Sequence, residues 1–141
     1  MNNIRQLSVF VENKPGKLSQ ITKILKKSGI DIRALSIADT KDFGILRIIV
    51  NNTEKACEVL READCTVTVT EVVAISIPDE MGSLSHVMTF LDESEINIEY
   101  MYSFLSKTDN KASIILRVDD NEKAHEYFAK GGIVQLTEND L

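Results

Sequence analysis

The second half of this sequence repeats the first. At an offset of 66 residues, "PGKLS" (residues 15–19) aligns with "MGSLS" (residues 81–85). At an offset of 68 residues, "VNNTEKACEVL" (residues 50–60) aligns with "VDDNEKAHEYF" (residues 118–128). A difference of two residues between matching blocks is typical of a surface loop, which tolerates insertions. The repeat therefore predicts a tandem duplication of one structural unit.

Each half contains the same ordered series of apolar patterns. Alternating apolar residues predict strands, and apolar residues at helical spacing predict helices. In the first half the series is a strand at 4–12, a helical stripe of Leu18, Ile21, Ile24 and Leu25, strands at 30–39 and 44–50, a helical stripe of Ala56, Val59, Leu60 and Ala63, and a strand at 65–70. The second half repeats it with strands near 73–77, 96–105, 113–118 and 132–136 and helical stripes near 84–91 and 124–128.

Each half is therefore predicted to be a βαββαβ unit. With right-handed crossovers this order produces a four-stranded antiparallel sheet with both helices on one face, the ferredoxin-like arrangement of the α+β class. We expect one domain at residues 1–70 and a second at residues 71–141, with a turn at 41–44 between the middle strands of the first. No Gly, Pro or polar linker interrupts "TVTVTEVVAISI" (residues 66–77), so the two units are expected to be rigidly joined.

The central strands suggest that the sheets do not stay uncovered. "ILRIIV" (residues 45–50) and "SIILRV" (residues 113–118) are apolar on both faces. The helices cover only one face of such a sheet, so the other half or a second copy of the chain is expected to cover the opposite face. We therefore expect a homodimer.

Composition excludes several classes of protein. The formal net charge of −6 opposes binding to nucleic acid and to anionic membranes. No run of residues approaches the 18 to 20 apolar positions of a membrane span, and the start shows no signal-peptide pattern, so a cytoplasmic location is expected. Cys57 and Cys65 do not form a C-x-x-C motif, so two buried, reduced thiols are expected. His86 and His125 have no partner at metal-ligand spacing, and neither a metal nor another cofactor is expected.

Two other classes share the βαββαβ order. RNA-recognition modules stack bases on aromatic side chains of the third strand, where this chain carries Ile45 and Arg47. Acylphosphatases need a phosphate-cradling loop with a positioned arginine, whereas the second loop here contains Asp79 and Glu80, which repel phosphate. No nucleophile, base and orienting residue can be assembled by spacing, so the chain is predicted to be non-catalytic.

The first half has a turn at Pro15-Gly16 before its first helix and enters its second strand at "GIDI" (residues 29–32). With these features each half resembles an ACT domain, a regulatory module of amino-acid metabolism that binds small molecules. In the second half Met81 replaces the proline and Glu95 replaces the glycine. The resemblance implies that pairs of such domains bind an amino acid between them, at the first loop of one domain and the second strand of its neighbour.

The loop chemistry agrees with this implication. Glycine at the mouth of a helix lets a ligand approach backbone N–H groups, and the first helical turn offers unpaired donors that suit a carboxylate. Asn13, and Asp79 in the second half, supply oxygens for an ammonium group. The predicted ligand-binding residues are Asn13, Lys14, Pro15, Gly16, Lys17 and Leu18 with Leu35 and Ser36, and Asp79, Glu80, Met81, Gly82, Ser83 and Leu84 with Met101 and Tyr102.

Two interpretations of function stay open. The first is a sensor that binds a free amino acid or a similar metabolite and that acts on an enzyme of amino-acid metabolism. The alternative is a protein assembly module without a small ligand, in which Asn-Lys-Pro-Gly is an ordinary turn and Asn13 satisfies a helix end. The row of Tyr100, Tyr102 and Phe104 is the clearest difference between the halves, and it is expected to pack against another unit or to select the ligand.

Overall fold

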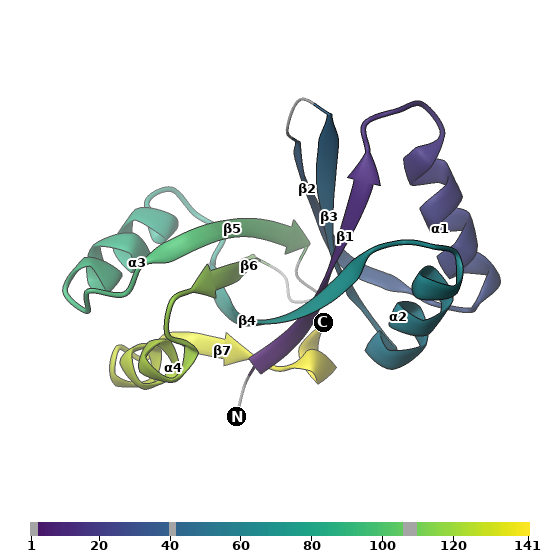
Figure 1. The fold of residues 1–141 in the computed structure, drawn as a ribbon. Coiled ribbons are helices and arrows are strands. Elements are labelled where there is room, and N and C mark those ends of the chain that lie inside the picture. Colours follow the sequence, from purple (N-terminus) through teal and green to yellow (C-terminus); the bar gives the residue numbers. More distant parts are fainter. Residues whose placement is uncertain (1–2, 40–41, 106–109) are drawn as a thin grey trace. The chain divides into compact units, whose positions relative to one another are not determined.

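The computed structural model describes residues 3–39, 42–105 and 110–141, and it contains the βαββαβ order twice (Figure 1). The elements are β1 (Asn3–Glu12), α1 (Lys17–Lys27), β2 (Ile32–Asp39), β3 (Phe43–Val50), α2 (Thr53–Glu62), β4 (Val67–Pro78), α3 (Ser83–Asp92), β5 (Ile98–Leu105), β6 (Lys111–Val118), α4 (Asn121–Lys130), β7 (Val134–Leu136) and the 3₁₀ turn η1 (Glu138–Asp140). The chain divides into two compact units. The first unit is residues 5–70, and the second unit is residues 71–141 together with residues 1–4.

The first unit is a four-stranded antiparallel sheet in the order β2-β3-β1-β4. Strands β1 and β3 pair in the register Val9↔Leu46, and β2 pairs with β3 in the register Leu35↔Ile48. At the other edge the Phe10 N–H donates to the Thr66 carbonyl at 3.0 Å. The predicted ferredoxin-like fold is confirmed for this unit. Lys41, in the turn predicted between β2 and β3, lies outside the described residues.

The second unit repeats this sheet in the order β5-β6-β4-β7. Strands β4 and β6 pair in the register Ile75↔Ile114. Strand β7 is only three residues long and pairs with Ala74–Ser76 of β4. It is shorter than the predicted strand at 132–136 because Gly132, at φ 68°, is still in the turn that follows α4.

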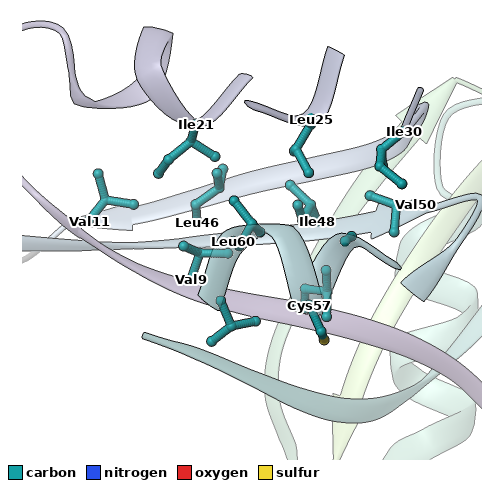
Figure 2. Packing of buried hydrophobic residues seen from close by; sticks show 13 residues of the cluster. Val9, Val11, Ile21, Leu25, Ile30, Leu46, Ile48, Val50, Cys57 and Leu60 are labelled. Carbon is teal, nitrogen blue, oxygen red and sulfur yellow. The ribbon is translucent and has the colours of Figure 1, made fainter. Parts of the chain in front are cut away.

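Each sheet buries one face under its two helices. Figure 2 shows this core in the first unit, where Leu46 and Ile48 of the sheet face Ile21 and Leu25 of α1. The second unit builds the equivalent core from the fully buried Phe128 and from Val73, Ile75, Leu91, Leu116 and their neighbours. The apolar stripes that sequence periodicity identified therefore account for most of both cores.

Several predicted core positions differ from the expectation. Leu18 and Leu84, in the first turns of α1 and α3, are 42% and 37% exposed, and Ala63, which follows α2, is exposed. All three lie at helix ends, where the periodic pattern continues beyond the residues that the sheet covers. Cys57 is buried as expected, but Cys65 is only half-buried, and both thiols are free. No helix within the described ranges is long and apolar enough to cross a membrane.

Candidate functional site

Helices α1 and α3 both begin at a glycine in the left-handed conformation. Gly16 has φ 87° and ψ −11°, and Gly82 has φ 88° and ψ −9°. A Cβ built on either glycine meets no atom within 4 Å. Glycine is therefore required here by the positive φ and not by crowding, and the space beside each helix start is open.

The two loops before these helices also share their backbone hydrogen bonds. Each bond in the first loop has a counterpart in the second at the equivalent residues. The Asn13 N–H donates to the Asp42 carbonyl at 3.2 Å, as the Asp79 N–H does to the Asn110 carbonyl at 2.8 Å. The Lys14 N–H donates to the Glu12 carbonyl at 2.8 Å, as the Glu80 N–H does to the Pro78 carbonyl at 3.0 Å. The Gln20 N–H donates to the Gly16 carbonyl, as the His86 N–H does to the Gly82 carbonyl, both at 3.0 Å. The substitution of Met81 for Pro15 therefore leaves the loop geometry unchanged.

Both helix starts are open, unlike those of the other two helices. Asn52 caps α2 and Asp120 caps α4 with a side-chain oxygen. Within the described residues neither α1 nor α3 has such a cap, and the N–H groups of residues 18 and 19 and of residues 84 and 85 have no acceptor. Asn13 therefore does not satisfy the end of α1. Each start offers backbone donors and the positive end of a helix dipole, which suit a carboxylate.

The cavity beside the first loop is small and lies between the loop, β2 and β3. Its volume is about 80 Å³, and it is lined by Val11, Glu12, Asn13, Lys14, Leu18, Ile37, Asp39, Gly44 and Leu46. The Lys14 ammonium pairs with the Glu12 carboxylate at 3.0 Å. The hydrogen bond and charge of Lys14, with a smaller contribution from Lys17, hold the pKa of the Glu12 carboxyl below its usual value.

The cavity of the second unit is a larger groove on another side of its loop. Its volume is about 500 Å³, and it lies between the start of α3, β4 and the turn from α4 into β7. It is lined by Ser76, Ile77, Pro78, Glu80, Met81, Gly82, Ser83, His86, Val87, Lys111, Gly131, Gly132, Ile133 and Val134. The two loops have the same backbone, but the space beside them differs in place and in size.

The predicted site residues divide between these cavities and other positions. Asn13, Lys14 and Leu18 line the first cavity, and Glu80, Met81, Gly82 and Ser83 line the groove. Pro15, Gly16, Lys17, Asp79 and Leu84 lie in the loops or first helical turns but line neither. On the strands, Leu35, Ser36, Met101 and Tyr102 line neither cavity. Their part in ligand binding stays a prediction.

Sequence reasoning missed other lining residues. Ile37 and Asp39 lie on the same face of β2 as Leu35, toward the strand end next to the loop, and they line the first cavity. Strand alternation contained this signal. Lys111 and the turn at residues 131–134 line the groove, although they are distant in sequence from the second loop. The adjacent pair Gly131-Gly132 was the one local indication of open space there.

The histidines differ in environment. His86 is exposed at the groove, whereas the ring of His125 is partly buried, with Nδ1 at 2.5 Å from Gln135 Oε1 and Nε2 at 2.6 Å from Asn3 Oδ1. The part of the chain that the structure describes contains no group of three or more His, Cys, Asp or Glu side chains that could hold a metal ion. Tyr100, Tyr102 and Phe104 are partly buried and line neither cavity.

Comparison with known proteins identifies one family over nearly the whole chain. The family model described as "ACT domain pair" matches residues 2–141. The crystal structure of protein BT0572 from Bacteroides thetaiotaomicron is similar, with 39% sequence identity and a TM-score of 0.92 over 98% of this chain and 94% of that one.

Two further similarities are more distant. The ligand-free regulatory subunit of aspartate kinase from Thermus thermophilus shares the fold, with a TM-score of 0.66 and 14% identity over 91% of this chain and 89% of that one. A probable acetolactate synthase small subunit from Archaeoglobus fulgidus is 28% identical over 81 residues. That match covers 53% of this chain and 51% of the relative, so it spans about half of each protein.

Proposed function

The chain belongs to the family of ACT domain pairs, and we propose that it is a non-catalytic regulatory protein that binds a free amino acid at its loop-and-helix starts. The observation that carries the proposal is the repeated geometry of those starts. Two loops of different sequence hold a left-handed glycine and uncapped N–H groups in the same arrangement. Such a start accepts a carboxylate through backbone donors and the helix dipole.

The names of related proteins support a regulatory role. The Archaeoglobus relative is named as a small subunit of acetolactate synthase, and one structure with the same fold is titled as a regulatory subunit of aspartate kinase. We propose that the partner of this chain is likewise an enzyme of amino-acid metabolism. Ligand binding regulates that enzyme only if the amino acid changes the affinity between the two proteins, which is a measurable coupling free energy.

A second candidate function is protein assembly without a small ligand. The observation that favours it is apolar exposure on the edge strand of the first unit, where Leu35 is 56% exposed and Ile37, on the same face of β2, is 47% exposed. Exposed apolar side chains on a strand at the edge of its unit's sheet are a feature of protein interfaces. Both functions are compatible with a homodimer, which we propose as the assembly state.

A thermal-shift screen tests the proposed function. The purified protein is heated with each of the twenty amino acids and with their 2-oxo acids. A ligand present at a hundredfold excess over its Kd stabilises the fold by about 2.7 kcal/mol, which raises Tm by several degrees. A shift with one or a few amino acids supports the sensor. No shift with any compound rejects the sensor and favours the assembly module, which is then sought by affinity for partner proteins.

A further inference from the structure

We propose that the groove of the second unit is an amino-acid site contained within that one unit, and that it selects a zwitterion with an apolar side chain. This inference rests on the proposed function and assigns its ligand to one half of the chain. The volumes are the first argument. The groove of about 500 Å³ lies in the usual range of ligand sites, about 300 to 1,000 Å³, whereas the cavity of about 80 Å³ beside the first loop lies well below it. The first unit has a second hollow of about 380 Å³ at Gly29, but none of its lining residues belongs to the loop before α1.

The second unit carries smaller residues than the first at aligned positions that line the groove. Ser83 replaces Lys17 at the helix start, and Gly131 and Gly132 replace Ala63 and Asp64 in the turn before the last strand. In the first unit a lysine starts from this helix position, and the charge of Lys17 partly offsets the increase in the pKa of the Cys65 thiol that burial and the charge of Asp64 cause. In the second unit no long side chain starts from the equivalent helix position.

The glycine wall of the groove is held in place by packing. A Cβ on Gly131 would lie 2.4 Å from the ring of Phe90, and that ring packs on Tyr127 with 4.7 Å between centroids. Gly132 has φ 68°, a conformation that side chains rarely adopt. The wall at these two residues is therefore bare backbone for structural reasons.

The charged residues of the groove match an amino-acid zwitterion. Glu80 and Lys111 both line it, and among the described residues neither side chain forms an ion pair. A carboxylate suits the ammonium of Lys111, with the Ser83 hydroxyl as a further donor, and an amino group suits Glu80. Glu80 opposes phosphate and other dianions. Opposite unpaired charges in one groove therefore favour a ligand that carries both signs.

The remaining wall selects the ligand's side chain. Ile77, Val87, Ile133 and Val134 line the groove with aliphatic groups, and Met81 adds a flexible apolar side chain. An aliphatic or aromatic side chain loses little by leaving water for such a wall, whereas a charged side chain loses its hydration. The apolar amino acids are therefore the expected ligands.

The first experiment fills the groove with the residue that the first unit carries. Ser83→Lys copies Lys17 on the same helical backbone, so we expect it to fold. Thr89→Lys is the matched control, because it adds the same charge to an exposed position of α3 outside the groove and copies Lys23 of α1. Calorimetry with leucine, isoleucine, valine, methionine and phenylalanine should show at least a tenfold loss of affinity in Ser83→Lys and wild-type affinity in Thr89→Lys.

A second experiment separates the two charges of the ligand. Glu80→Gln should weaken binding of the amino acid by at least about tenfold and leave binding of its 2-oxo acid, which has no ammonium group, unchanged. Glu93→Gln, at the exposed end of α3, is the control for the change in net charge. A wild-type response to both compounds in Glu80→Gln would contradict the proposed role of this carboxylate.

The outcomes distinguish failure of this inference from failure of the proposed function. If no amino acid binds the wild-type protein, the proposed function fails. If an amino acid binds equally well to folded Ser83→Lys, the groove is not its site, but the proposed function stands. If an acidic or basic amino acid binds most tightly, the apolar selectivity is wrong.

Discussion

The two units of this protein have the same backbone conformation at their first loops, but the cavities beside these loops differ in position and volume. Gly16 and Gly82 differ by only one degree in φ. Yet the cavity of the first unit lies toward β2 and β3, and the groove of the second lies toward β7. The half that departs more from the family pattern, with Met81 in place of proline, has the larger cavity beside its loop. The loop sequence therefore indicates the backbone geometry of a helix start, but it does not indicate the volume available to a ligand.

The largest expected effect tests whether the two helix starts are equivalent. Gly16→Val and Gly82→Val each place a β-branched residue at φ near 87° to 88°, which should lower the free energy of unfolding by about 2 to 3 kcal/mol. Chemical denaturation measures both losses. Gly16→Asn and Gly82→Asn are the controls, because asparagine tolerates this conformation and should cost less. Unequal losses at the two positions would show that the starts are under different constraints.

The next effect concerns packing that only the second unit has. Gly131→Ala brings a methyl group into the ring of Phe90 and should lower the free energy of unfolding by about 1 to 2 kcal/mol. At the equivalent positions the first unit carries Ile24 and Ala63. The double variant Phe90→Ile with Gly131→Ala copies that pair. Its loss of free energy of unfolding should therefore be smaller than the sum of the losses of the two single variants. If the stability losses measured by thermal denaturation are additive, the ring of Phe90 is not the group with which the methyl group at residue 131 clashes.

A smaller effect with the opposite sign is expected at the end of α3. Glu95 has φ 61°, whereas its counterpart Gly29 has φ 72°. Glu95→Gly should therefore stabilise the protein by about 0.5 to 1 kcal/mol, because relief of the strained conformation outweighs the greater freedom of glycine in the unfolded chain. The reverse variant, Gly29→Glu, should destabilise it. A loss of stability in Glu95→Gly would indicate that the side chain makes a compensating contact.

The smallest expected effect is a pH dependence at Glu12 of the first unit. Lys14 and Lys17 lower the pKa of the Glu12 carboxyl, and Pro78 stands at the equivalent position of the second unit. Because the pKa of Glu12 is lower in the folded state, its interactions with the lysines stabilise the fold at pH values above the unfolded-state pKa. This contribution to stability is lost as the pH falls through the folded-state pKa. Lys14→Gln should raise the Glu12 pKa toward the ordinary value in an NMR titration. An unchanged titration would show that the ion pair does not form in solution.

Sequence periodicity predicted the fold because the fold depends on local patterns. Alternation at Leu7, Val9 and Val11 and helical spacing at Ile21 and Leu25 each indicate one buried face, and all five side chains are buried. The duplication then required that the second half form the same elements. The exceptions are at element ends, such as Leu18, where the apolar pattern extends beyond the contacts that bury it.

The sequence by itself determined two ferredoxin-like units and two glycine-containing helix starts, since these follow from residues near one another in the chain. Only the tertiary structure decided where a ligand has room. The groove depends on Ser83, Gly131 and Lys111, which come from three separate elements, and on the ring of Phe90, which excludes a side chain at residue 131. The volume of a cavity is what remains after distant side chains have packed, and no local pattern encodes that remainder.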